Sequence, residues 1–197
     1  MKNPFNIVFT GRSGSGKGTQ AQLVKEKLLA MGEEVHSVNT GAYLRELTTH
    51  DELLTGRLVD TKIMKAGLKA PDALALWAWV NEVIHGINDR NHFILDGSPR
   101  TVAEARVLDE LLEFYERSNV FPVFLDVSDQ WAYDRMIARG RVDDLHENIK
   151  NRLAYYPIFV EPVMDYFANE SKNKLIRING EQSIATVHAD ILKALGL

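Results

Sequence analysis

One glycine-rich segment constrains this chain more than any other. Residues 11–19 read GRSGSGKGT, and they lie between an apolar run at 5–10 and a helical pattern at 20–31. Glycines at these spacings let backbone N–H groups turn inward around an anion, and the following helix N-terminus adds partial positive charge. Lys17 would reach the β- and γ-phosphates of a nucleotide. Strand, loop and helix in this order predict a phosphate-binding loop rather than an ordinary glycine-rich turn.

Composition limits the class of protein. A chain of 197 residues, 45% of them hydrophobic, suffices for one globular unit with a sizeable core. Its formal charge of -4 argues against nucleic acid or an anionic membrane as the main partner. The sequence contains no cysteine for a disulfide or a thiolate metal site, and no apolar run reaches the roughly 20 residues of a membrane span. The N-terminus reads as a strand and not as a signal peptide, so we expect a cytosolic protein.

Strands and helices alternate along the chain. Apolar runs predict further strands at 34–39, 91–96, 119–127 and 174–178. Helical periodicity predicts helices at 41–48, 52–66, 71–85, 102–117, 129–138 and 184–195, and two more within 145–168 that separate near Tyr156 and Pro157. This order predicts an α/β fold of the P-loop NTPase type, a three-layer arrangement in which helices cover both faces of a five-stranded parallel sheet. Such sheets bind ligands at the carboxyl ends of their strands.

Two places interrupt this alternation. About fifty residues of helix between the second and third strands are too many for one crossover connection, and they predict a small binding insertion. Residues 139–144 (RGRVDD) form a short charged loop between helices, suited to a mobile cover. We therefore expect one kinase-type domain over 1–197, with its core at 1–39, 71–138 and 145–197, an insertion at about 40–70 and a short lid at about 139–144.

Charged side chains near these features are candidates for chemistry. Asp96 ends an apolar strand, where a carboxylate can hold Mg²⁺ or its waters, although it can also merely cap the next helix. Gly97 permits close backbone approach, and Arg100 offers a planar fork for a phosphate. A solvated basic face is the ordinary interpretation of arginines at helical spacing. Here several of them accompany Lys17, as transfer between two phosphates demands, because the transition state spreads negative charge over several oxygens. These arginines are Arg135, Arg139, Arg141 and Arg152.

Two acidic residues keep two interpretations open. Asp143 and Asp144 either orient the guanidinium groups or cap the helix that starts near Leu145, with Glu147 completing a capping box. The six histidines show no metal-ligand spacing, and no Ser/His/Asp arrangement is apparent. Trp131 falls in a helical pattern and is expected to pack rather than to stack on a base. The lack of a Ser/His/Asp arrangement is compatible with phosphoryl transfer to a phosphate, because an acceptor that is already an anion needs no general base.

Several motifs occur in an order known from one family. They are residues 11–20 (GRSGSGKGTQ), Thr40-Gly41 with Leu44-Arg45, 96–101 (DGSPRT), 141–144 (RVDD), 150–153 (KNRL) and 178–180 (ING). Together they resemble the adenylate kinase family of nucleoside monophosphate kinases over nearly the full length. The resemblance implies the reaction of MgATP with a nucleoside monophosphate, most often AMP, to give two diphosphates. It also implies a monomer whose insertion and lid close over the substrates.

The resemblance implies roles for individual residues. Asp96 would hold Mg²⁺ through water, and Arg141 and Arg152 would bridge both substrates. The implied catalytic residues are Lys17, Arg100, Arg139, Arg141 and Arg152. The implied ATP-binding residues are Ser13, Gly14, Ser15, Gly16, Lys17, Gly18, Thr19, Arg135, Arg139 and Gln182. The implied acceptor-binding residues are Thr40, Gly41, Arg45, Met64, Leu68, Lys69, Ala70, Gly97, Arg100, Glu104, Arg141 and Arg152.

Glu104 is the departure that bears on the acceptor. The family usually has Gln there, which donates to adenine N1 and accepts from N6. An ionised carboxylate only accepts, so it suits the donors of guanine better. Thr101-x-x-Glu104 also fits a capping box, which would leave Glu104 a structural role. We expect AMP, with GMP, CMP or UMP as the alternative acceptors. The other departures are Ser13 for Pro, Ala42 for Asp, Ala70 for Val and Ser98 for Phe.

The lid departs further from the family. Only Gly140 separates Arg139 from Arg141, and the zinc-holding lid of some relatives is excluded without cysteine. A short lid excludes water from the site less well, so we expect ATP hydrolysis to compete with phosphoryl transfer. Two rival functions stay open. One is a small-metabolite kinase, whose acceptor hydroxyl would need a base. The other is a catalytically weak nucleotide-binding interaction protein with ATPase activity.

Overall fold

The computed structural model describes residues 4–173 and 175–197. Five strands form one parallel sheet in the order β2-β3-β1-β4-β5, which confirms the predicted α/β fold. Asp96 pairs with Phe9 on one side and with Asn39 on the other, so the carboxyl ends of three strands meet at one edge. Lys174, where the last strand was predicted to begin, lies outside the described residues. The strands are β1 (Phe5–Thr10), β2 (Val35–Asn39), β3 (His92–Asp96), β4 (Asn119–Asp126) and β5 (Ile176–Asn179).

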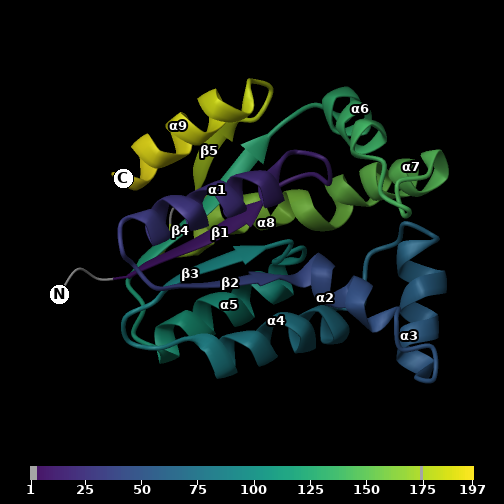
Figure 1. The fold of residues 1–197 in the computed structure, drawn as a ribbon, viewed down its shortest axis with the longest axis horizontal. Helices are drawn as coiled ribbons and strands as arrows, with labels where there is room; N and C mark the ends of the chain where they lie inside the picture. Colours follow the sequence, from purple (N-terminus) through teal and green to yellow (C-terminus); the bar gives the residue numbers. More distant parts are fainter. Residues whose placement is uncertain (1–3, 174) are drawn as a thin grey trace.

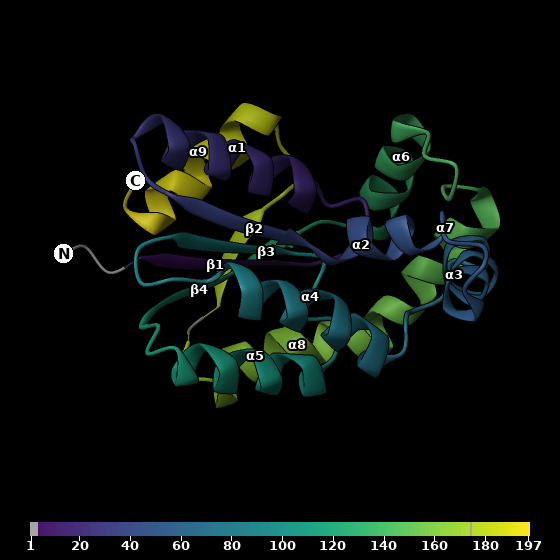
Figure 2. The same cartoon turned by 60° about the horizontal axis from the view of Figure 1, so that its bottom comes forward.

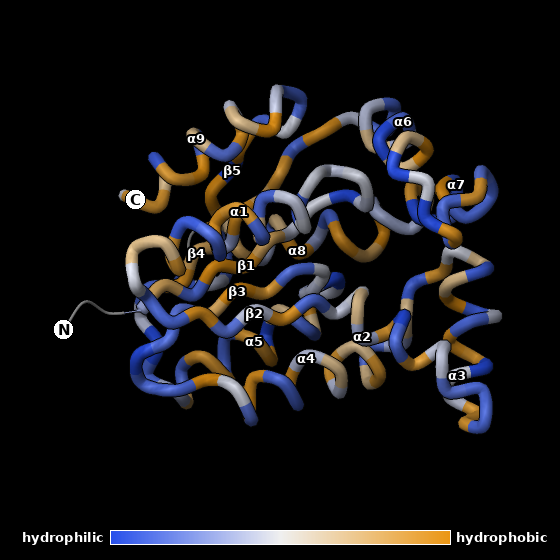
Figure 3. The backbone as a smooth tube through the Cα atoms, in the orientation of Figure 1, coloured by the Kyte–Doolittle hydropathy of each residue, from blue (hydrophilic) through white to orange (hydrophobic). Residues whose placement is uncertain are grey.

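Helices cover both faces of the sheet. The helices α1 (Lys17–Ala30) and α9 (Ile184–Leu195) lie on one face, and α4 (Asp72–Gly86), α5 (Val102–Phe114) and α8 (Glu161–Asp165) lie on the other (Figures 1 and 2). Successive β1 residues point to opposite faces, so Ile7 belongs to one apolar core and Val8 to the other. The three central strands β1, β3 and β4 are correspondingly hydrophobic along most of their length (Figure 3). Burial on both faces explains their continuous apolar runs.

The long connection between β2 and β3 forms its own small unit. It contains α2 (Thr40–Leu47), α3 (Leu54–Leu58) and a π-helical turn η1 (Val59–Met64). Four buried side chains hold these pieces together: Leu44, Val59, Met64 and Ala70. In Figure 1 this unit lies at the end of the molecule opposite the termini, across from α6 (Asp129–Arg139) and α7 (His146–Tyr155).

The structure corrects two predicted helices. The helix expected over 52–66 begins at Leu54 and turns π-helical at Val59. The expected break near Pro157 is absent, because α7 continues through the π-helical η2 (Tyr156–Val160) into α8 and then η3 (Tyr166–Glu170). A proline lacks an N–H and its ring crowds the preceding turn, and widened turns accommodate this without ending the helix. Among the described residues, no helix is long and apolar enough to cross a membrane.

Candidate active site

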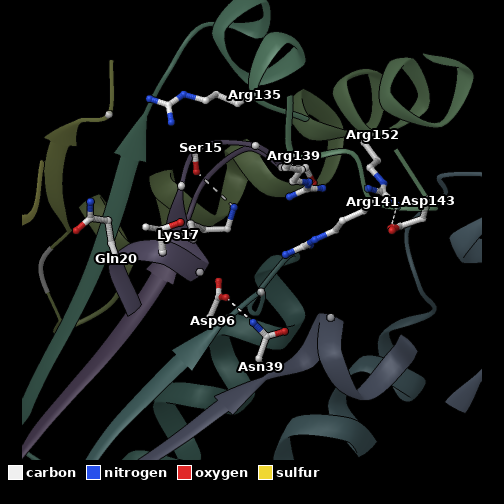
Figure 4. Close-up of a pocket in the computed structure, with 18 of the residues that line it drawn as sticks. Ser15, Lys17, Gln20, Asn39, Asp96, Arg135, Arg139, Arg141, Asp143 and Arg152 are labelled. Atoms are coloured by element: carbon white, nitrogen blue, oxygen red, sulfur yellow. Dashed lines mark hydrogen bonds and ion pairs between the residues drawn. The ribbon is translucent and has the colours of Figure 1, made fainter. Parts of the chain in front are cut away.

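A cavity of about 550 Å³ opens at the carboxyl ends of the strands. Its wall is formed by the glycine-rich loop, by insertion residues such as Arg45, by Asp96 at the end of β3 and by arginines from α6 and α7. Figure 4 shows these side chains arriving from separate elements. The alternation of strands and helices brings them together, because every strand of a parallel sheet ends at the same edge. The cavity is therefore the candidate active site.

The glycine-rich loop has the backbone that its sequence predicts. Gly14 and Gly16 have φ angles of 85° and 95°, a region that residues with a Cβ rarely adopt. A Cβ on Gly14 would lie 2.4 Å from the Ala132 carbonyl oxygen, so the loop lies directly against α6. In the described part of the chain, no side chain caps the N-terminus of α1. Its first N–H groups are thus available to an anion.

Lys17 rests on its own loop. Its Nζ donates to the carbonyl oxygens of Gly11 at 2.9 Å and Arg12 at 2.6 Å. Burial, aided by nearby arginines and opposed by Asp96, lowers its pKa to about 8. A bound phosphate would supply the missing negative charge.

Asp143 and Asp144 orient the arginines around the cavity. Asp144 accepts from Arg139 at 2.5 and 2.8 Å and from Arg152 at 3.0 Å, and Asp143 pairs with Arg152. The residue that precedes α7 is Leu145, which has no side-chain acceptor. Within the described residues, the side-chain bonds of Asp143 and Asp144 go to arginines and not to the start of α7, so the alternative capping box is not formed there. Burial opposes ionisation of Asp143, but Arg152 outweighs it and lowers the pKa of that carboxyl.

Arg141 carries positive charge into the centre of the site. Its side chain points toward Lys17 and Asp96 (Figure 4). Burial, with Arg139 nearby, lowers the pKa of Arg141, and burial with Arg141 nearby does the same for Arg45. Arginine still stays protonated at neutral pH. The cavity thus brings cationic groups close together, and a bound anion would offset the repulsion between them.

The ATP-binding residues implied by the family all line this cavity. Trp131, which was expected to pack, does so in part but also reaches the cavity, where the Arg135 guanidinium lies 4.8 Å from its ring. Gln182 donates to Asp190 at 3.0 Å. The spacing of Trp131 and Arg135 by one helical turn was the sequence signal for this pair. The residues concerned are Ser13, Gly14, Ser15, Gly16, Lys17, Gly18, Thr19, Arg135, Arg139 and Gln182.

The acceptor-binding residues that the family implies divide into two groups. Eight line the cavity, and Arg100 is held there by bonds from Nη1 to the Tyr155 hydroxyl at 2.8 Å and from Nε to the Gly97 carbonyl at 3.0 Å. Tyr155 had no sequence signal. The eight are Gly41, Arg45, Met64, Leu68, Gly97, Arg100, Arg141 and Arg152. The four that do not line it are Thr40, Lys69, Ala70 and Glu104.

Those four residues have structural partners in this conformation. Thr40 donates to the Ser98 hydroxyl at 3.1 Å. Lys69 donates to Asp72 at 2.5 Å and to the Ala70 carbonyl at 2.8 Å. Ala70 belongs to the core of the insertion. The Val to Ala departure therefore lies in packing around the acceptor pocket rather than on its wall.

Glu104 is buried and does not line the cavity. Its backbone N–H donates to the Thr101 hydroxyl at 3.2 Å, so half of the predicted capping box exists. Its carboxyl interacts with Ser98, and among the described residues Oε2 has no hydrogen-bond partner. Burial raises the pKa of Glu104 against the opposing influence of Ser98 and Arg100. An unpaired buried carboxyl oxygen is costly and is a candidate for a ligand contact.

The surroundings of Asp96 fit a metal ion that binds together with a nucleotide. It is buried, accepts from the Asn39 amide at 2.6 Å, and lies so close to the loop that a Cβ on Gly18 would be 3.1 Å from its Oδ2. Asn39 was not among the site residues predicted from the sequence. Its side chain also caps α2 by accepting from the Ala42 N–H at 2.7 Å. Within the described residues no three acidic, histidine or cysteine groups converge as a metal site. One carboxylate beside a phosphate loop still fits Mg²⁺, which takes few protein ligands and completes its shell with water and phosphate oxygens.

Comparison with known proteins agrees with this geometry. The family model described as adenylate kinase matches residues 9–172. A relative from Nostoc sp. named adenylate kinase 1 is 33% identical over 96% of this chain and 98% of its own length. Proteins named adenylate kinase from Leptospira biflexa and Stenotrophomonas maltophilia are each 34% identical, over 96% and 97% of this chain and 98% and 99% of their own lengths.

Proposed function

The chain belongs to the adenylate kinase family of nucleoside monophosphate kinases, and from this premise we propose that it transfers the γ-phosphoryl group of ATP to AMP. One observation carries the proposal: cationic side chains from five separate segments surround one cavity. Neutralising two phosphate chains laid end to end requires such convergence. These side chains are Lys17, Arg45, Arg100, Arg139, Arg141 and Arg152.

The donor side is the glycine-rich loop. The N–H groups at the start of α1 and the Lys17 ammonium bind the ATP phosphates, once Lys17 leaves the loop carbonyls that now hold it. Arg135 and Gln182 lie further along the cavity, where the base would extend. Mg²⁺, bound with ATP and held through water by Asp96, would neutralise charge on the β- and γ-phosphates.

The acceptor side is the insertion together with the end of β3. Arg45 and Arg100 bind the acceptor phosphate, and Arg141 and Arg152 contact the phosphoryl group as it passes between the two nucleotides. The acceptor oxygen is already an anion, so no general base is needed. The residues thus act by positioning and by electrostatic stabilisation.

Glu104 supports AMP over GMP as the acceptor. A neutral carboxyl donates through its O–H and accepts through its C=O, which is the pattern adenine N1 and N6 require. An ionised one would favour guanine instead. Burial raises the pKa of Glu104 and so extends the pH range over which this carboxyl is neutral. We assign the unpaired Oε2 to the base, although Glu104 lies behind the cavity wall in this conformation, so neighbouring side chains would have to move when the acceptor binds.

An acceptor panel tests the proposal. The protein is mixed with MgATP and, separately, with AMP, GMP, CMP or UMP, and diphosphate formation is measured. We expect AMP to react fastest. A preference for GMP would overturn the acceptor assignment, and no diphosphate with any acceptor would leave the nucleotide-binding interaction protein.

The short lid is tested in the same assay. Release of inorganic phosphate from ATP without acceptor measures how well residues 139–144 exclude water. We expect measurable hydrolysis that AMP suppresses. No release without acceptor, together with normal transfer, would remove that expectation. A monomeric, cytosolic enzyme stays our prediction for its state in the cell.

A further inference from the structure

One side chain of the phosphate loop turns away from the cavity. Arg12 does not line the cavity, and its Nε donates to Oδ1 of Asp129 at 2.6 Å. Its guanidinium carbon lies 3.9 Å from the centre of the Tyr156 ring. The Arg12 side chain is only 20% exposed. An arginine beside a phosphate site is thus committed to protein partners.

The two partners belong to helices that carry other arginines of the site. Asp129 is the first residue of α6, which bears Arg135 and Arg139. Tyr156 follows the last residue of α7, which bears Arg152. One guanidinium therefore joins the loop to both helices.

The backbone of Arg12 is also part of the loop that holds Lys17. Its carbonyl oxygen accepts from Lys17 Nζ at 2.6 Å and from the Ser15 N–H at 3.2 Å. Both the side chain and the backbone of Arg12 are thus held by protein partners within the site.

A second contact fixes the loop against α6. Gly14 lies so close to the helix that an added Cβ would meet the Ala132 carbonyl at 2.4 Å and Met136 at 3.0 Å. Asp129 and Ala132 are one turn apart on α6. Two points of attachment one turn apart restrain both the position of the helix and its rotation.

We propose that Arg12 is a positioning residue that fastens α6 and the α7 end to the phosphate loop, so that Arg135, Arg139 and Arg152 are in place before ATP arrives, given that ATP occupies this cavity as proposed above. A preformed site binds more tightly, because its side chains lose little conformational entropy when the ligand binds. Of the three positioned arginines, AMP would meet only Arg152, and its other contacts lie in the insertion and at the end of β3. The fastening therefore affects ATP more than AMP.

Asp129→Asn tests this with little risk to folding, because the Asp129 side chain is 63% exposed. Dissociation constants for ATP and for AMP are measured by calorimetry, beside Arg12→Ala and the double variant. Asp134→Asn is the matched control, since it removes an exposed acidic charge from the same helix without touching Arg12. A partly exposed ion pair contributes up to about 1 kcal/mol, which corresponds to about fivefold in affinity.

We expect Asp129→Asn and Arg12→Ala each to weaken ATP binding severalfold and AMP binding clearly less, because only Arg152 of the positioned arginines serves AMP. The Asp134→Asn control should bind both nucleotides as the wild type does. The double variant should bind ATP no more weakly than Arg12→Ala alone, because both changes remove one shared contact. Unchanged ATP affinity, equal losses for ATP and AMP, or additive losses would each overturn the proposal. If the wild-type protein bound ATP but formed no ADP, the proposed function would fail while this comparison still decided the role of Arg12.

Discussion

Lys17 is the residue on which the donor side depends. It is half-buried, desolvation lowers its pKa to about 8, and its only hydrogen-bond partners in the described structure are loop oxygens. Replacing it with Ala removes a preorganised cation from the ATP phosphates. We expect Lys17→Ala to lose about 100-fold or more in kcat, as removal of one such donor does elsewhere. Steady-state kinetics measure this, with an unchanged circular dichroism spectrum as the control for folding. Near-normal turnover would contradict the assigned role.

The same lysine predicts how ATP binding depends on pH. A group with a pKa of about 8 loses its charge as pH rises through that value. We expect the affinity of the free enzyme for ATP to fall above pH 8 and to be nearly flat below it. Calorimetric titration at a series of pH values checks this. The Lys17→Ala variant should lack this dependence, and an identical slope in both proteins would show that another group titrates.

Glu104 makes a separate prediction for the acceptor. Deprotonation removes the O–H donor that adenine N1 needs, so wild-type kcat/KM for AMP should fall as pH rises through the raised pKa of this carboxyl. Glu104→Gln keeps a donor and an acceptor at every pH. With ATP saturating, we expect the variant to accept AMP with a flatter pH profile and to lose activity with GMP. Identical profiles for the two proteins would mean that Glu104 does not contact the base.

At the scale of elements, α7 holds the insertion in place. The Asn151 amide donates to the Ala66 carbonyl at 2.9 Å, and the Asn148 amide donates to the Met64 carbonyl at 3.1 Å. Gly67, with a φ of 65°, approaches α7 so closely that a Cβ would lie 2.4 Å from the Asn148 carbonyl. These bonds are the direct polar link between the acceptor unit and the helix that carries Arg152.

Loosening that link should affect the acceptor. A hydrogen bond of this kind contributes about 1 kcal/mol, so Asn151→Ala should raise KM for AMP about fivefold and leave KM for ATP unchanged. Lys150→Ala, an exposed change on the same helix, is the control. Equal changes in both KM values would show instead that the site as a whole is disturbed.

At the scale of the whole molecule, a titratable group lies at the opposite end of the sheet from the cavity. His92 begins β3, and its Nδ1 accepts from the Phe5 N–H at 2.9 Å. Burial lowers its pKa, although Glu33 at 3.5 Å from Nε2 opposes this. A protonated imidazole could not accept from Phe5. The neutral ring is therefore the form that joins β1 to β3 here.

This histidine predicts a loss of stability in acid. Its pKa is lower in the folded than in the unfolded chain, so the unfolded chain binds the extra proton first as pH falls below about 6.5. The free energy of unfolding should then decrease until the folded pKa is passed. Urea unfolding between pH 7 and pH 5 measures this, and His92→Gln should reduce the slope. An equal slope in the variant would assign the dependence to other groups.

The sequence by itself determined what local pattern can encode. The loop at 11–19, the apolar strands and the acid that ends β3 were predictable, because each is specified by neighbours within one element. Alternation of elements then led to the parallel sheet and to the edge where the site lies. Motif spacing also led to the family that the comparisons show.

Only the tertiary structure decided how the side chains share their partners. It showed that Asp144 holds Arg139 and Arg152 instead of capping α7, that Arg12 reaches Asp129, and that Asn39 bonds Asp96. These contacts join residues distant in sequence or compete with a local alternative of similar energy, so no local pattern specifies them. The burial that shifts the pKa values of Lys17 and Glu104 is likewise a property of the assembled fold, because desolvation depends on everything packed around a group.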